Sequence, residues 1–287
     1  MLISKYFIEF IIYSFIGWVW ECFYCTFKEH RWENRGFLYG PVVPIYGVGA
    51  VAVTILFTHV PFLNELRLSL YGSAATAYRS LGKGISELLN NQGTFPWFSL
   101  LLIFIICALG SVVLEYGTSY YLEKKFHARW WDYQDMPLNI NGRVCLPATC
   151  LFGIAGVLVV RFLIPVSAGL ETRLPALPAE AIALILMCIF AWDTALTVSS
   201  LTGFVHRLES LESTFNETME SKYQSLSETP ALIREKGQSI AENLGQFRRS
   251  LDVRQRYALR SIRRFTSGKA NEAHKKLIKY ISGVQDE

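Results

Sequence analysis

The sequence predicts an all-α polytopic membrane protein with about five transmembrane helices and a helical tail. Hydrophobic residues make up 51% of the 287 positions and charged residues only 18%, which is below the usual share in soluble domains. The charge is unevenly spread, because residues 204–287 hold 15 of the 28 Lys and Arg residues. These observations indicate an apolar body followed by a basic tail.

Five apolar runs are long enough to cross a bilayer, which takes roughly 20 residues per helix. They cover residues 6–27, 41–60, 96–122, 144–165 and 178–203. A helix buried in a soluble core would rarely stay apolar on every side over such a length. The first run lacks the basic start and small-residue cleavage site of a signal peptide. We therefore expect a transmembrane domain over 1–203 and a separate tail over 204–287.

The distribution of Lys and Arg predicts the orientation. With the tail in the cytoplasm, the short inner loops carry seven basic residues and the outer side carries five. The positive-inside rule then places the N-terminus outside and the C-terminal tail in the cytoplasm. Residues 61–95 become an extracytoplasmic loop. Apolar residues spaced by three and four between Tyr71 and Leu88 predict an amphipathic helix in it.

The two predicted cytoplasmic loops, 28–40 and 123–143, resemble each other. A glutamate precedes each loop, Glu21 in one case and Glu115 in the other, and each following span opens with the pattern Pro-x5-Gly. Each loop also contains a cluster of the same three residue types, Asn34-Arg35-Gly36 and Asn141-Gly142-Arg143. We interpret this as a parallel two-helix repeat around one cytoplasmic mouth. Coincidence is the alternative, since the match is short.

Ionisable residues inside apolar runs are the first functional candidates. A charge at mid-bilayer costs about 2.5–3.5 kcal/mol, so it normally faces the protein interior. Asp193, in the fifth run, is expected in a pathway or in a buried hydrogen bond. Glu9 and Arg161, near outer ends, are expected to extend toward the interface. The pathway or gate candidates are Glu21, Asn34, Arg35, Glu115, Asn141, Arg143 and Asp193.

In this set, Glu21 and Glu115 lie just inside the cytoplasmic boundary of the membrane. Arg35 and Arg143 lie just outside it. This placement predicts Glu–Arg pairs, crossed between the repeat units or not. Such pairs either pin loops to helices or exchange for an anionic ligand.

The stretch "WENRGFLYGPVVPIYG", residues 32–47, predicts a structured re-entrant mouth rather than a plain turn. Gly36 and Gly40 permit tight turns. Pro41 suits the first turn of a helix. Non-helical backbone at membrane depth is tolerated only against protein or water, so the segment should lie at a functional opening.

Aromatic and basic clusters predict two surfaces. Trp130, Trp131, Asp132 and Tyr133 are typical of an interfacial belt and are candidates for docking a partner protein. The tail forms a helical hairpin or a coiled coil. Its basic face could bind the anionic headgroups of membrane lipids or be simply solvated; its candidates are Arg249, Arg256, Arg260 and Arg263. No motif indicates a nucleic-acid partner.

The sequence contains no nucleotide-binding, nucleophile or metal signature, which argues against an enzyme. We predict no catalytic residue, no metal and no cofactor. The pair Cys22-x-x-Cys25 lies on an apolar helix without a second pair at ligand spacing, so we interpret it as packing.

Four stretches, "YSFIGWVWE", "NRGFLYGPVVPIYG", "LEYGTSYYLEKKF" and "RWWDYQDMPLNINGRVCL", resemble the CmpB-like family of bacterial type IV ABC-transporter permeases. The resemblance covers about residues 5–165, with the fifth run included. It implies a membrane subunit of a transporter in the bacterial cytoplasmic (inner) membrane, powered by a separate ATPase. It assigns no substrate and no site residue.

Two other functions remain open on the residues alone. One is a membrane enzyme acting on a lipid-linked or phosphate-bearing substrate, with carboxylates as acid or base. The other is a membrane scaffold that recruits envelope partners through its tail. Five helices make a small bundle to enclose a pathway, so we expect a homo-dimer or a hetero-complex.

Overall fold

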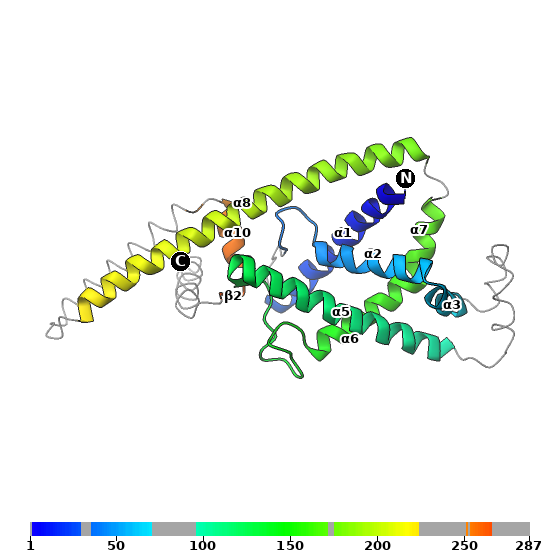
Figure 1. Ribbon diagram of the computed structural model, residues 1–287, viewed down its shortest axis with the longest axis horizontal. Coiled ribbons are helices and arrows are strands. Elements are labelled where there is room, and N and C mark those ends of the chain that lie inside the picture. The colour runs from blue at the N-terminus through cyan, green and yellow to red at the C-terminus, as the bar shows by residue number, and fades with distance from the viewer. Residues whose placement is uncertain are drawn as a thin grey trace. The chain divides into compact units, whose positions relative to one another are not determined.

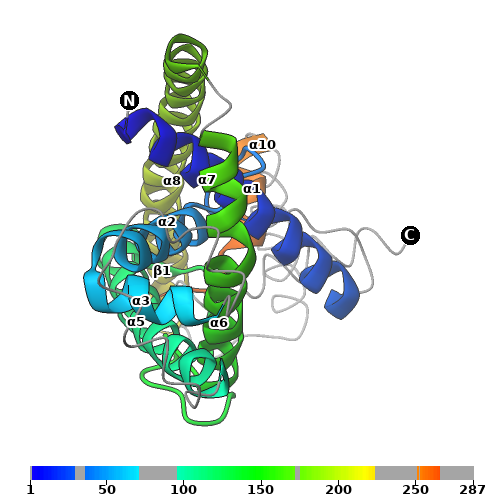
Figure 2. The ribbon, with the colours of Figure 1, turned by 90° about the vertical axis from the view of Figure 1, so that its right-hand side faces the viewer.

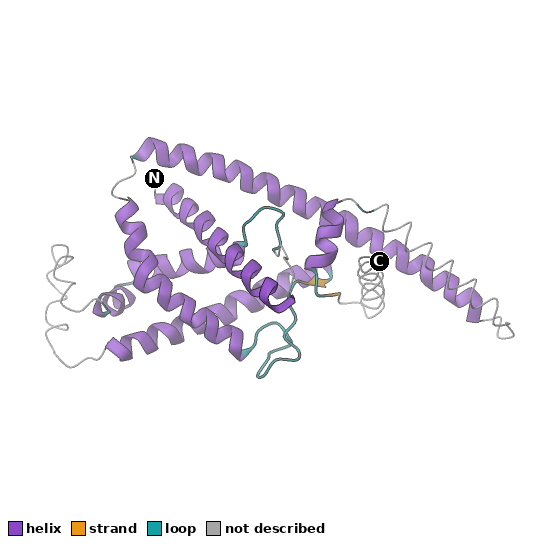
Figure 3. Cartoon of the chain, turned by 180° about the vertical axis from the view of Figure 1, so that it is seen from behind, coloured by secondary structure: helices purple, strands orange, loops and turns teal. Residues whose placement is uncertain are grey.

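The computed structural model describes residues 2–29, 36–70, 96–171, 175–223, 251 and 253–265. Helices make up nearly all of it (Figure 3). They are α1 (Leu2–Glu29), α2 (Pro44–His59), α3 (Pro61–Ser69), α5 (Pro96–Phe126), α6 (Leu146–Leu158), the π-helix η2 (Val159–Leu163), α7 (Ile164–Glu171), α8 (Ala176–Tyr223) and α10 (Val253–Ser261). Two-residue strands β1 (Ala128–Arg129) and β2 (Arg264–Phe265) pair antiparallel. The predicted fold class is confirmed, and the chain is an all-α polytopic membrane protein.

Four helical segments are long and apolar enough to span a membrane. They are Ile3–Phe27, Trp97–Phe126, Leu146–Ser167 and Ala176–Gly203, and they correspond to four of the five predicted runs. The second predicted run is different. Helix α2 has 16 residues and is therefore about 24 Å long, short of the roughly 30 Å hydrocarbon core. Only together with α3 does it reach span length.

Helices α2 and α3 meet at a bend of 95°, which Figures 1 and 2 show. The bend is encoded by Val60 and Pro61. A residue before proline avoids the helical region, and Val60 is extended with φ −85° and ψ 117°. Pro61 then starts the new helix, where its missing N–H costs nothing. The pair is either one broken span or a re-entrant hairpin.

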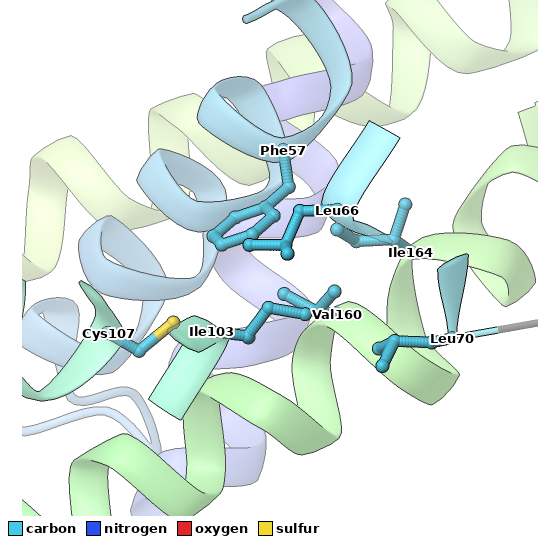
Figure 4. Close-up of a cluster of buried hydrophobic side chains, with 7 residues drawn as sticks. All are labelled: Phe57, Leu66, Leu70, Ile103, Cys107, Val160 and Ile164. Carbon is cyan, nitrogen blue, oxygen red and sulfur yellow. The ribbon is translucent and has the colours of Figure 1, made fainter. Parts of the chain in front are cut away.

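Helix α3 folds back into the bundle instead of lying apart from it. Side chains of α2, α3, α5, η2 and α7 form one buried apolar cluster (Figure 4), made of Phe57, Leu66, Leu70, Ile103, Cys107, Val160 and Ile164. The start of the predicted outer loop 61–95 therefore belongs to the core. The amphipathic stripe predicted from Tyr71 onward lies outside the described residues.

Glycines allow close approach of the membrane helices. Gly47 of α2 abuts Ser14 and Phe10 of α1. In the other predicted repeat unit, Gly153 abuts Phe104 of α5, and Gly156 abuts Cys107. Small residues at such contacts are typical of helix pairs in membranes. Close glycine contacts therefore occur in both the α1–α2 pair and the α5–α6 pair. The repeat itself stays a prediction.

Glu9 corrects one expectation. Its side chain is 7% exposed and so does not extend toward the interface. The reason is that Glu9 shares a face of α1 with Tyr13, one turn further on, and the Tyr13 side chain reaches Thr54 of α2 and Ser167 of α7.

The chain divides into two compact units. The first comprises Met1–Arg35, Pro41–Thr118 and Tyr133–Ala191, and the second comprises Gly36–Gly40, Ser119–Asp132 and Trp192–Glu287. Helix α8 runs without a break past Gly203 to Tyr223. The predicted domain division between residues 203 and 204 stays a prediction.

Candidate functional site

Two of the predicted pathway residues lie close together in the first unit. The Tyr46 hydroxyl of α2 donates a hydrogen bond of 3.4 Å to Oε1 of Glu21 on α1. Glu115 of α5 is near enough to Glu21 to repel it electrostatically, and Tyr133 neighbours both carboxylates. We call these four residues the carboxylate cluster. In the described part of the chain, no three His, Cys, Asp or Glu side chains are arranged to hold a metal ion.

Glu115 is the most unusual member of the cluster. It is only 3% exposed, and its Oε2 atom is buried without a hydrogen-bond partner among the described residues. Burying an ionised carboxylate without compensation is very costly. A buried carboxyl of this kind therefore calls for a proton or a positively charged species beside it.

Tyr133, on the loop between α5 and α6, supplies a neutral hydroxyl to the cluster. Burial raises the pKa of Tyr133, and the nearby Glu115 raises it further. Burial likewise raises the pKa of the Cys145 thiol at the start of α6. Both groups therefore stay protonated at neutral pH and can act as hydrogen-bond donors without adding negative charge.

The second Asn/Gly/Arg cluster lies against Tyr116 of α5. The Asn141 side-chain amide donates to the Tyr116 hydroxyl at 3.2 Å. The Arg143 guanidinium carbon lies 5.0 Å from the centroid of the Tyr116 ring, a cation–π distance. Arg143 makes further contacts, and a Glu115–Arg143 pair stays a prediction. Asn34 and Arg35 lie outside the described residues, so a Glu21–Arg35 pair stays a prediction.

Sequence reasoning missed the compact loop that connects Tyr133 to Val144. The Tyr133 N–H donates to Gly142 O at 2.8 Å, and the Ile140 N–H donates to Val144 O at 3.0 Å. The Asn139 side chain braces the interior, because its amide donates to Gln134 O and Met136 O while its oxygen accepts the Gly142 N–H. We call residues 133–144 the braced loop. The turn-forming run Pro-Leu-Asn-Ile-Asn-Gly is the signal that could have revealed it.

In the second unit, Asp193 anchors the segment Gly36–Gly40. Its Oδ2 accepts the Gly40 N–H at 2.9 Å. From α10, the Tyr257 hydroxyl donates to Leu38 O at 3.1 Å and lies 3.4 Å from Gly36 O. We call this arrangement the backbone clamp. The sequence predicted either a pathway role or a hydrogen bond for Asp193, and the structure shows the hydrogen bond.

The stretch before α2 is irregular over residues 36–43, and α2 begins at Pro44. The sequence suggested that Pro41 lies in the first turn of the helix. This prediction is wrong, because α2 begins three residues later. Pro44 takes that place instead, because the clamp holds Gly40, and Val43 is extended with its N–H bonded to Ser14 O. Within this stretch Leu38 and Val43 are buried, whereas Pro41 is exposed.

The aromatic run and the tail meet in the second unit. The Trp130 ring contacts Phe37 at 5.2 Å and Phe126 at 5.9 Å between centroids. The Arg263 N–H donates to Arg129 O at 2.8 Å beside the β1–β2 pairing. Trp131 and Asp132 are half-buried.

Only part of the predicted basic face of the tail is described. Arg256 is exposed and donates from Nε to Leu251 O, and Arg263 is exposed. Arg249 and the Arg260 side chain lie outside the described residues. Lipid binding by this face stays a prediction.

Fold and site together define a polytopic membrane protein with ionisable groups enclosed in its helix bundle. Residues 8–198 match the family described as "Putative ABC-transporter type IV", and the chain belongs to this family. The match confirms the resemblance noted in the sequence and covers all four candidate spans in whole or in large part. No curated protein matches the chain, and no solved structure matches it.

Proposed function

We propose that the chain is the membrane-spanning, permease-like subunit of an ABC transporter, powered by a separate ATP-hydrolysing subunit. Membership of the family supports the transporter role. A separate ATP-hydrolysing subunit would supply the nucleotide-binding motif that residues 1–287 lack. The protein would lie in the bacterial cytoplasmic membrane with its N-terminus outside and its tail inside.

The buried Glu115 is the observation that carries the pathway proposal. An ionisable group deep in a membrane protein is costly, and it is retained where it serves a pathway or a relay. Glu115 lies beside a second carboxylate and two tyrosine hydroxyls, contributed by α1, α2, α5 and the braced loop. Helices and loop together can change the surroundings of Glu115 when they move. We place the substrate pathway or its gate at this cluster.

The test is affinity purification of the tagged protein from its native host after cross-linking in cells. We expect an ATP-binding subunit in stoichiometric amount, and ATP hydrolysis by the recovered complex in lipid nanodiscs. Glu115→Gln should keep the subunit but lower the hydrolysis rate at least tenfold. Glu65→Gln, on α3, is the matched control and should leave the rate unchanged.

Two outcomes would contradict the proposal. Recovery of the protein alone, or only with envelope proteins, would favour a scaffold. An unchanged hydrolysis rate in Glu115→Gln would remove the carboxylate cluster from the working cycle.

A further inference from the structure

A second buried polar group lies in the first unit, away from the carboxylate cluster. It consists of one carboxylate and three hydroxyls, contributed by α1, α2 and α7, and its members are Glu9, Tyr13, Thr54 and Ser167. We call these four residues the hydroxyl cluster. Glu9 precedes Glu21 by twelve residues on α1, which is about 18 Å along the helix. The two clusters are therefore separate sites.

The hydroxyl cluster is shielded from solvent. Glu9 is 7% exposed, Tyr13 6% and Thr54 4%, and Ser167 is half-buried. Glu9 lies one turn before Tyr13 and interacts with it electrostatically. Buried polar groups need hydrogen-bond partners, and buried charges need compensation. The protons and positive charges near these four oxygen-bearing side chains therefore have to be counted.

The hydroxyl protons of Thr54 and Ser167 point away from the cluster. Thr54 Oγ1 donates to Ala50 O at 2.9 Å, and Ser167 Oγ donates to Ile164 O at 3.0 Å. A carbonyl oxygen can only accept a hydrogen bond, so each hydroxyl spends its proton on the backbone of its own helix. Toward Tyr13, both oxygens therefore present lone pairs.

Tyr13 cannot satisfy both of these oxygens. Its side chain is within hydrogen-bonding reach of Thr54 and of Ser167, but a phenolic hydroxyl carries only one proton. The cluster therefore offers more oxygen lone pairs than protons, beside the negative charge of Glu9. Hard cations bind to sets of oxygen ligands of this kind.

We propose that the hydroxyl cluster binds a sodium ion, with the Glu9 carboxylate and the three hydroxyl oxygens as ligands. A single carboxylate balances the charge of a monovalent ion. Transition metals prefer imidazole and thiolate ligands, and no three His, Cys, Asp or Glu side chains come together in the described part of the chain. The ion would join α1, α2 and α7. This site does not depend on the function proposed above.

An irregular turn in the third helix is a separate observation that agrees with a functional site. The π-helix η2 directly precedes α7, and the Ile164 N–H donates to Val159 O across it. Single π-turns within α-helices occur frequently at functional sites. Such a turn inserts an extra residue, so it changes which side chains of α7, Ser167 among them, face the neighbouring helices.

Lys5 is a cation of the chain that can compete for the site. It lies four residues before Glu9 on α1, and residues at this spacing are neighbours on the same face of a helix. Its ammonium group can neutralise Glu9 when sodium is absent. Removal of the Lys5 charge should therefore increase the apparent affinity for sodium.

The first experiment measures thermal unfolding of the full chain in detergent, with choline chloride replaced by sodium chloride at constant ionic strength. We expect sodium to raise the unfolding midpoint by at least about 3 °C at saturation, because an ion that binds only the folded state stabilises it. Equal midpoints in the two salts would overturn the proposal.

The second experiment repeats this comparison with variants. Glu9→Gln and Thr54→Val should each lose the difference between sodium and choline, whereas Glu65→Gln, a carboxylate of α3 outside the cluster, should keep it. The difference is taken within each variant, so a general loss of stability does not affect it. A full difference in Glu9→Gln would overturn the site.

Lys5→Gln separates an ion site from a structural contact between Lys5 and Glu9. We expect half of the sodium effect at a concentration at least threefold lower than in the wild type. Loss of the sodium effect in this variant would overturn the proposal. Binding of radioactive sodium gives a direct check, with one ion per chain expected in the wild type and none in Glu9→Gln. Each of these results leaves the proposed transporter function standing.

Discussion

At the scale of single residues, the two membrane acids Glu115 and Asp193 differ in what surrounds them. Asp193 has a specific partner in the Gly40 amide. Glu115 has a buried oxygen with no partner in the described chain. An acid that accepts a backbone N–H has a structural role, whereas a buried carboxyl oxygen without a hydrogen-bond partner gives Glu115 none of that kind. This contrast is why the pathway proposal uses Glu115 and not Asp193.

Substitution of Asp193 tests the anchoring role. Asp193→Ala leaves the Gly40 N–H without its acceptor, which should cost about 1–3 kcal/mol. Hydrogen exchange of the 36–43 segment should accelerate accordingly. Asp193→Asn keeps an acceptor oxygen, so it should retain most of the protection. Fast exchange in both variants would show that the negative charge, and not the hydrogen bond, holds the segment.

At the scale of elements, glycine contacts set the distances between helices. A Cβ on Gly17 of α1 would run into the Tyr46 ring, and the ring also packs on Phe152. Gly110 holds a similar position in the other predicted repeat unit, but nothing lies within 4 Å of its would-be Cβ. The two glycines therefore give a matched pair for mutagenesis.

Gly17→Ala should destabilise the protein by about 1–3 kcal/mol, the usual cost of overpacking. It should also displace Tyr46 from Glu21. Gly110→Ala should be neutral or stabilising by up to about 1 kcal/mol, because alanine is the better helix former. Thermal unfolding in detergent measures both. Equal destabilisation by the two variants would contradict the α1–α2 contact described here.

The tail element α10 is tied to the segment before α2 through Tyr257. Tyr257→Phe removes the hydroxyl that bonds Leu38 O but keeps the ring contact with Tyr39. We expect a loss of about 0.5–1.5 kcal/mol in the local stability of residues 36–40. Tyr257→Ala removes both the hydrogen bond and the ring contact, so it should lower the local stability of residues 36–40 further. Hydrogen exchange of 36–43 and 253–261 measures the effect, and unchanged exchange in Tyr257→Ala would show that the clamp is dispensable.

At the scale of the whole molecule, the membrane topology depends on the α2–α3 pair. If the pair crosses the bilayer, the chain has five spans, and the braced loop and the N-terminus lie on opposite sides. If it is re-entrant, the chain has four spans, and the braced loop and the N-terminus lie on the same side. The braced loop and the tail lie on the same side in both arrangements, because two candidate spans separate them. The proposed orientation, with the N-terminus outside and the tail inside, requires the first arrangement.

Cysteine labelling distinguishes the two arrangements. In a background without the native cysteines, Ile3→Cys, near the N-terminus, should react with a membrane-impermeant maleimide on intact cells if the α2–α3 pair crosses the bilayer, and only in opened cells if the pair is re-entrant. Leu138→Cys should react only after the cells are opened. Reaction of Leu138→Cys on intact cells would place the braced loop, and with it the tail, outside and would contradict the proposed orientation.

Local patterns predicted the spans, because hydropathy needs no knowledge of partners. The similarity of the two loops predicted one shared mouth, but it did not predict that Glu21 and Glu115 lie close to each other. The burial of Leu66 and the clamp on Gly40 could not be predicted. Each depends on groups remote in sequence, and the Gly40 and Leu38 bonds reach 153 and 219 residues along the chain. The positive φ angles of Leu138 and Asn141 in the braced loop could not be predicted either, because no hydrophobic periodicity encodes them.

The backbone clamp also imposes an order on biosynthesis. The segment Gly36–Gly40 emerges early, but its two anchors, Asp193 and Tyr257, are made much later. At the usual rate of about 5–20 residues per second, the ribosome needs roughly 10–40 s to travel from Leu38 to Tyr257. During that time, the first loop has to wait beside the membrane without its final partners. The segment Gly36–Gly40 is thus fixed only after Tyr257 has been made. A nascent chain halted before Tyr257 should therefore leave this segment open to proteases.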